Sequence, residues 1–196
     1  MKGGSRRPIS FTEIGSPKIN KDAIYYFLII DCGGDTTVKS YIIEQRDSLQ
    51  KKGYKAIFGL LDVRPKWERK DIKILKKSLY YKLPQKDLET KFILSIMEIE
   101  AWFLAEEKHY QKIDPNLTVD FIIENYKFDP TKNTELLNQP AKLLNKIYQD
   151  VGKAYHKDKK QITRTVEILD YANIYLEVPK RIPSLKELID SIEKHL

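Results

Sequence analysis

The chain has 196 residues, of which 41% are hydrophobic and 32% are charged, and its formal net charge is +7. This length and composition suit one domain with a real core, and they exclude collagen-like, low-complexity and disulfide-rich chains. The longest apolar run, residues 23–30, is too short to span a bilayer. A single cysteine, Cys32, and a basic start with no apolar segment behind it predict a cytoplasmic protein without membrane association.

The positive charge is unevenly distributed along the chain. Residues 1–100 contain 20 Lys and Arg against 13 Asp and Glu, whereas residues 101–196 contain 15 of each. All of the excess therefore lies in the first half. Such a surface allows a polyanionic partner, but an ordinary solvated basic surface explains it equally well.

The first half alternates predicted strands with predicted helices. The apolar run that ends at Asp31 and a Gly-Gly turn is typical of a strand buried on both faces. We predict strands over residues 9–14, 24–31, 56–63 and 91–97, and helices over residues 36–52, 67–80 and 98–110. This order predicts an α/β fold in which a mostly parallel sheet carries helices on both faces.

The second half contains no strong strand pattern. Prolines separate four predicted helices, and Ser184 before Leu185-Lys186-Glu187 matches a capping box. The helices are expected over residues 119–125, 140–150, 161–175 and 184–195. We therefore expect an α/β unit over residues 1–112 and a helical region over residues 113–196, packed together as one compact unit.

Acidic side chains recur where the predicted strands end, and parallel strands bring their carboxyl ends to one edge of the sheet. The acids of this set are Asp31, Asp35, Asp62, Glu98 and Glu100. Several carboxylates at one edge repel one another unless a cation lies among them. Oxygen ligands suit Mg²⁺ or Mn²⁺, which are common in phosphodiester chemistry.

Each of these acids also has a structural interpretation. Asp35 precedes Thr36-Thr37 and suits a helix N-cap, whereas Asp31 can hydrogen-bond the glycine turn. Asp62 can pair with Arg64 or a lysine, and the two glutamates suit the first turn of a helix, where the macrodipole favours acids. Considered alone, each acid favours a structural role. Considered together, acids at the ends of three successive strands favour a metal site.

Two groups of basic residues are candidates for binding nucleic acid. Their members are Lys66, Lys70, Lys73 and Lys77, which form one stripe along a predicted helix, and Lys153, Lys157, Lys159, Lys160 and Arg164. A solvated helix face and a loop cap are the alternatives. Binding by either group is expected to weaken steeply with salt. His109 is expected at the surface, and Trp102 in the core.

Three strings in this chain resemble a known family. They are YFLIIDCGGD at residues 26–35, GLLDVRP at residues 59–65 and MEIEAWFLAE at residues 97–106, and GKAY at residues 152–155 adds to them. The family is an uncharacterised prokaryotic one, related to the Toprim domains of OLD-type nucleases. Its members are often encoded beside an AAA/ABC-type ATPase in phage-defence loci.

The resemblance implies a Toprim-like fold with an acidic Mg²⁺ site that nicks or cleaves DNA or RNA, together with an ATPase partner. By position, the resemblance makes Asp62 and Glu100 catalytic and implies that Asp31 and Asp35 are further metal ligands; we expect Glu98 to be an auxiliary ligand. Arg64 stands where the family pattern has a second aspartate, and it is expected to bind phosphate. The same pattern leads us to expect that an N-terminal strand and helix carrying a glutamate are missing.

Two other functions remain open from the sequence. One is a non-catalytic module with a Toprim-like fold that binds a partner ATPase or nucleic acid. The other is a phosphohydrolase that uses the same carboxylates on a small molecule.

Overall fold

A computed structural model describes residues 25–84 and 87–196 of the chain. The predicted strand over residues 9–14 lies outside the described residues. The first elements along the chain are α1 (Asp35–Lys51), β1 (Ala56–Asp62), η1 (Arg69–Asp71), α2 (Ile72–Tyr80) and β2 (Glu89–Ser95). They are followed by α3 (Glu100–Ala105), α4 (Lys108–Ile113), α5 (Val119–Tyr126), η2 (Thr134–Leu136), α6 (Pro140–Gln149), α7 (Lys159–Ile168), α8 (Tyr171–Leu176), η3 (Val178–Lys180) and α9 (Pro183–Glu193).

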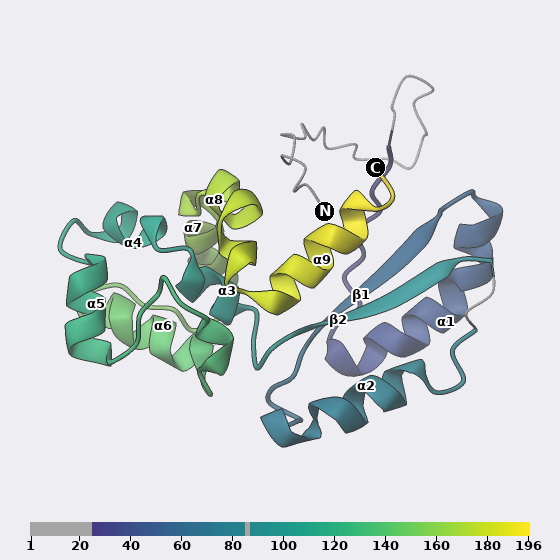
Figure 1. The fold of residues 1–196 in the computed structure, drawn as a ribbon, viewed down its shortest axis with the longest axis horizontal. Helices are drawn as coiled ribbons and strands as arrows, with labels where there is room; N and C mark the ends of the chain where they lie inside the picture. Colours follow the sequence, from purple (N-terminus) through teal and green to yellow (C-terminus); the bar gives the residue numbers. More distant parts are fainter. Residues whose placement is uncertain (1–24, 85–86) are drawn as a thin grey trace.

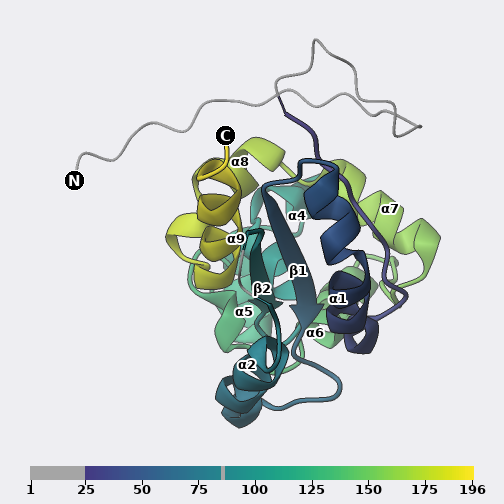
Figure 2. The same cartoon turned by 90° about the vertical axis from the view of Figure 1, so that its right-hand side faces the viewer.

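The sheet of the described residues consists of two parallel strands, β1 and β2. Their register runs from Ala56 opposite Glu89 to Asp62 opposite Ser95. Helices α1 and α2 cover one face of the sheet, and α9 lies on the opposite side against β2 (Figures 1 and 2). The fold is thus mixed helix and strand, built around a small parallel sheet.

The face that α1 covers is closely packed because β1 carries a glycine there. A Cβ at Gly59 would lie 2.8 Å from Phe92 Cδ1, 2.9 Å from Ile42 Cδ1 and 3.0 Å from Val38 Cγ1. The missing side chain therefore lets α1 approach the sheet. Leu75 and Leu79 of α2 belong to the same buried cluster.

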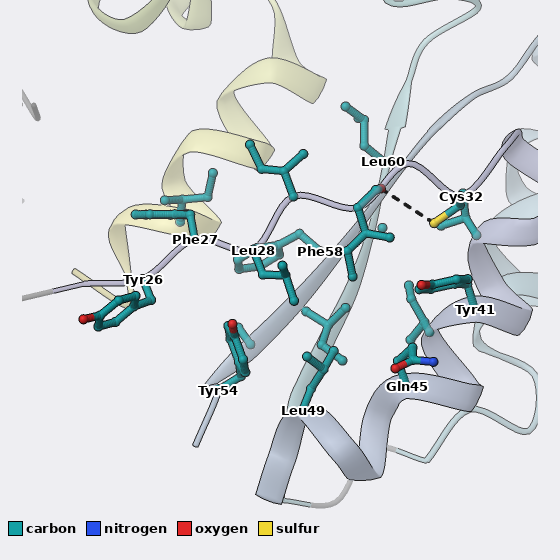
Figure 3. A pocket seen from close by; sticks show the side chains of 18 of the residues that line it. Tyr26, Phe27, Leu28, Cys32, Tyr41, Gln45, Leu49, Tyr54, Phe58 and Leu60 are labelled. Carbon is teal, nitrogen blue, oxygen red and sulfur yellow. Dashed lines mark hydrogen bonds between the residues drawn. The ribbon is translucent and has the colours of Figure 1, made fainter. Parts of the chain in front are cut away.

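The predicted strand over residues 24–31 is wrong for the residues that the structure describes. Residues 25–32 have no regular secondary structure, and Ile29 is 93% exposed. The segment borders β1 across an apolar hollow of about 770 Å³, lined by residues such as Phe27, Leu49 and Phe58 (Figure 3). An apolar run indicates a buried strand only when a neighbouring strand pairs with it, and no ladder forms here.

The second half forms its own core from helices α3 to α7. Leu104, Tyr110, Ile122, Leu144 and Tyr148 are among its fully buried members. A third cluster joins α3 to η3 and α9. Helix α9 then returns to the sheet, where Lys91 donates a hydrogen bond of 2.8 Å to Ser191 and pairs with Glu187. The C-terminal helix therefore packs on the α/β half.

Two predicted helices are each divided in two by buried polar contacts. The helix expected over residues 98–110 ends at Ala105, because Glu106 turns the backbone and accepts a hydrogen bond from Lys108 N at 3.1 Å. The helix expected over residues 161–175 stops at Ile168, and Asp170 begins α8 by accepting from Asn173 N at 2.9 Å. At α8 the boundary is set by a capping aspartate, whereas at α4 the Glu106 side chain accepts from the backbone without being the N-cap.

Ser184 does not form the predicted capping box. Helix α9 starts at Pro183, and the Ser184 hydroxyl instead donates to Glu135 and accepts from Trp102 Nε1 at 2.9 Å. Trp102 lies in the core as expected. The prediction for His109 is wrong, because this residue is fully buried beside Tyr110.

Candidate functional site

Three of the sequence-predicted acids meet around one lysine. The Lys157 Nζ atom lies 3.1 Å from Glu100 Oε2, 3.4 Å from Glu98 Oε1 and 3.9 Å from Asp62 Oδ2. Asp62 ends β1, and the two glutamates lie around the start of α3. We call Asp62, Glu98, Glu100 and Lys157 the carboxylate cluster.

Asp62 is held in place by the neighbouring strand and by the turn that leads into α3. Its Oδ1 atom accepts hydrogen bonds from Ser95 Oγ and, at 2.9 Å, from Ile99 N. The pKa of Asp62 is raised to about 6, mainly by burial and also by the Glu100 charge, against the opposing effects of the hydrogen bond from Ser95 and the charge of Lys157. A proton or a cation at this carboxylate is therefore more favourable than at an exposed aspartate.

The two glutamates are each held by a different part of the helical half. Glu98 Oε2 accepts from Ala141 N at the start of α6 at 3.0 Å. Glu100 is 2% exposed, and its Oε1 atom accepts from the Tyr155 hydroxyl at 2.8 Å. Burial first, and then the Glu100 charge, raise the pKa of Tyr155, so its hydroxyl keeps the proton that it donates.

The three carboxylates share one arrangement. In each of them one oxygen is fixed by a protein donor, and the other oxygen faces the Lys157 ammonium. Glu100 Oε2 is buried and has no hydrogen-bond donor. Outer hydrogen bonds of this kind orient carboxylates toward a shared cation.

The other two predicted acids lie differently. The Asp35 Oδ1 atom accepts from Asp62 N at 3.0 Å, so Asp35 adjoins the cluster through the backbone rather than capping α1. Asp31 accepts from Gly33 N at 2.8 Å within its own turn, as the structural interpretation of that residue expects. Arg64 donates to Asn138 O at 2.8 Å and does not take up the suggested pairing with Asp62.

The donor chemistry of the carboxylate cluster fits a hard divalent cation, but the spacing is that of an ammonium complex. Within residues 25–84 and 87–196, no group of three or more His, Cys, Asp or Glu side chains is placed to hold a metal ion. The cluster oxygens stand 3.1 to 3.9 Å from Lys157 Nζ, whereas Mg²⁺ needs oxygens at about 2.0–2.1 Å. The three carboxylates must close inward to hold a metal.

The two basic groups occupy separate surfaces. On and before α2, Lys66, Lys70, Lys73 and Lys77 are all exposed, and Lys70 pairs with Glu68 at 2.8 Å. The second group lines an open groove along α7. We call it the basic groove; its lining includes Gly152, Lys153, Ala154, Lys159, Lys160 and Arg164. Lys157 lies between these lining residues in sequence but points into the carboxylate cluster.

Two site residues were missed by the sequence reasoning. Tyr155, which holds Glu100, belongs to a string noted only for its resemblance, and Ser95, which holds Asp62, ends a predicted strand without any distinguishing pattern. Lys157 was expected to bind nucleic acid rather than carboxylates. No local signal marks a contact between positions 59 residues apart, as Lys157 and Glu98 are.

Comparisons with known proteins returned no match to a family model, a curated protein or a solved structure. In the described part of the chain, no helix has the length and apolar character needed to cross a membrane.

Proposed function

We propose that this chain is a Mg²⁺- or Mn²⁺-dependent enzyme of the Toprim-like class that nicks or cleaves nucleic acid at the carboxylate cluster. The observation that carries the proposal is that three fixed carboxylates turn one oxygen each toward a common cation. Structural ion pairs need one carboxylate for each ammonium, whereas this cluster has three. The excess negative charge favours a divalent ion.

In this proposal, the residues of the site have different roles. Asp62, Glu98 and Glu100 hold the cation, Ser95 and Tyr155 fix the carboxylates, and Asp35 adds negative charge beside Asp62. When bound, the cation activates water and stabilises the leaving oxygen of a phosphodiester. The basic groove supplies lysines for the phosphates on either side of the scissile bond.

Plasmid nicking with Mg²⁺ or Mn²⁺ tests this function. Wild-type protein is expected to convert supercoiled plasmid to the open circle, and Asp62→Asn and Glu100→Gln are expected to lose that activity. Glu44→Gln, an exposed acid on α1, serves as the matched control and should keep it. Nicking that survives in both cluster variants would show that the activity resides elsewhere or in a contaminant.

One observation favours a second function, a non-catalytic module that binds an ATPase or nucleic acid. Lys157 already joins the end of β1, the start of α3 and the loop before α7, so the carboxylate cluster also serves as an internal tie between the two halves. Millimolar Mg²⁺ or Mn²⁺ distinguishes the two. A rise in the unfolding temperature supports the enzyme, because a ligand that binds only the folded state stabilises it. An unchanged unfolding temperature supports the module.

A further inference from the structure

Lys157 enters the carboxylate cluster from the solvent side. Its side chain is 42% exposed, whereas that of Glu100 is 2% exposed. The lysine thus covers the oxygens that the protein interior leaves without a donor, Glu100 Oε2 above all. Lys157 is the most exposed member of the cluster, at 42% against 23% for Asp62 and 16% for Glu98.

The backbone on both sides of Lys157 is anchored outside the carboxylate cluster, whereas its side chain is held by ion pairs with the carboxylates. Tyr155 N donates to Asn145 Oδ1 at 2.7 Å, and Asp158 Oδ1 accepts from Gln161 N at 3.0 Å at the start of α7. Between these anchors, Lys157 has a left-handed backbone with φ of 61°. Its ammonium lies 3.1 Å from Glu100 Oε2 and 3.4 Å from Glu98 Oε1. The side chain can therefore turn away while Tyr155 stays on Glu100.

The cluster holds more negative charge than Lys157 can balance. Three carboxylates face one ammonium, which lies 3.1 Å from Glu100, 3.4 Å from Glu98 and 3.9 Å from Asp62. A divalent ion would balance the charge better than the ammonium does. The basic groove is near Lys157 along the chain, because Ala154 and Lys159 line it.

We propose that Lys157 is a built-in counter-ion, which a divalent cation displaces from the three carboxylates and which then binds a phosphate of the nucleic acid in the basic groove. This inference rests on the proposed function. It makes Lys157 a positioning residue that holds the carboxylates and offsets part of their charge until the cation arrives. No bond forms or breaks in this exchange, and only ion pairs change partners.

Binding of Mn²⁺ alone, followed by electron paramagnetic resonance, provides the first test. Lys157→Gln is expected to bind Mn²⁺ on the order of tenfold more tightly than wild type, because one competing positive charge is gone. Lys132→Gln removes the same charge from an exposed position in the helical half and should leave the affinity unchanged. Lys157→Gln should also need more DNA for half-maximal nicking.

The outcomes separate this inference from the function on which it rests. If Mn²⁺ binds wild type and Lys157→Gln equally, or binds the variant more weakly, the counter-ion role is wrong and the metal site stands. If Mn²⁺ binds neither protein, the metal site and the counter-ion role are both wrong.

A second test needs no variant, so it does not depend on how Lys157→Gln folds. Amine-reactive labelling of wild-type protein, read by mass spectrometry, should modify Lys157 several-fold faster in Mg²⁺ than without it, while Lys132 is unaffected. Equal labelling of Lys157 with and without Mg²⁺, in protein shown to bind the ion, overturns the displacement.

Discussion

Glu106 is a buried carboxylate that ties the turn between α3 and α4 to the start of α8. It is fully buried, and it accepts hydrogen bonds from Lys108 N at 3.1 Å, Asp170 N at 3.2 Å and Asn173 Nδ2 at 2.8 Å. His109 Nδ1 lies 3.6 Å from Glu106 Oε2. Removing the carboxylate takes the acceptor from Lys108 N and Asp170 N, which are part-buried, and leaves Asn173 Nδ2 with only its longer bond of 3.4 Å to Glu107 Oε2.

We therefore expect Glu106→Ala to lower the free energy of unfolding by about 3 to 5 kcal/mol at neutral pH, since each stranded donor costs about 1–3 kcal/mol. Urea unfolding followed by circular dichroism measures this loss. Glu124→Gln, an exposed acid on α5, is the control and should change stability little. A loss below about 1 kcal/mol for Glu106→Ala would refute the argument, because the donors would then have found other acceptors.

The same residue predicts a pH dependence. Burial alone would raise the pKa of Glu106, but the hydrogen bonds from His109, Asn173 and Asp170 N outweigh it and hold the pKa below the ordinary 4.5. As the pH falls below 4.5, the unfolded chain therefore takes up this proton before the folded chain does. The stability that the ionised carboxylate provides at higher pH is lost as the pH falls through the pKa of the folded state. In a plot of unfolding temperature against pH, Glu106→Gln should lack the part of the fall at acid pH that comes from protonation of this carboxylate. A fall identical to that of wild type contradicts the prediction.

Three further predictions concern packing, a buried hydrogen bond and the basic groove. Gly59→Ala should destabilise the protein by about 1–3 kcal/mol, because its Cβ would lie 2.8 Å from Phe92 Cδ1 and overpack the face under α1; an unchanged urea midpoint would contradict this. Trp102→Phe removes the bond from Nε1 to Ser184 Oγ and should cost about 0.5–1.5 kcal/mol in the same assay; a neutral result would mean that Ser184 finds another donor. Lys159→Gln with Lys160→Gln should reduce the slope of log affinity for double-stranded DNA against log salt by about 2, as expected for two lost phosphate contacts; an unchanged slope in a filter-binding titration places the DNA on another surface.

The sequence by itself determined most of the local elements. The apolar periodicity of residues 36–52 and 140–150 and the short apolar runs of residues 56–63 and 91–97 correspond to α1, α6, β1 and β2 within a few residues. These signals are local, because a helix or strand buries a face whose spacing is written within about a dozen neighbouring residues. The expected convergence of acids at strand ends holds for Asp62, Glu98 and Glu100, because β1 and β2 pair in parallel, but not for Asp31, which stays in its own turn.

Only the tertiary structure decided which partner each side chain has. The run at residues 24–31 has the composition of a buried strand, yet residues 25–31 pair with no strand and Ile29 is exposed. His109 is buried, Ser184 bonds Glu135 rather than capping α9, and Lys157 lies among carboxylates rather than in the basic groove. Each of these outcomes depends on segments distant in sequence. The free energy of a buried polar group depends on the partner that it finds, and that partner is set by the packing of the whole chain.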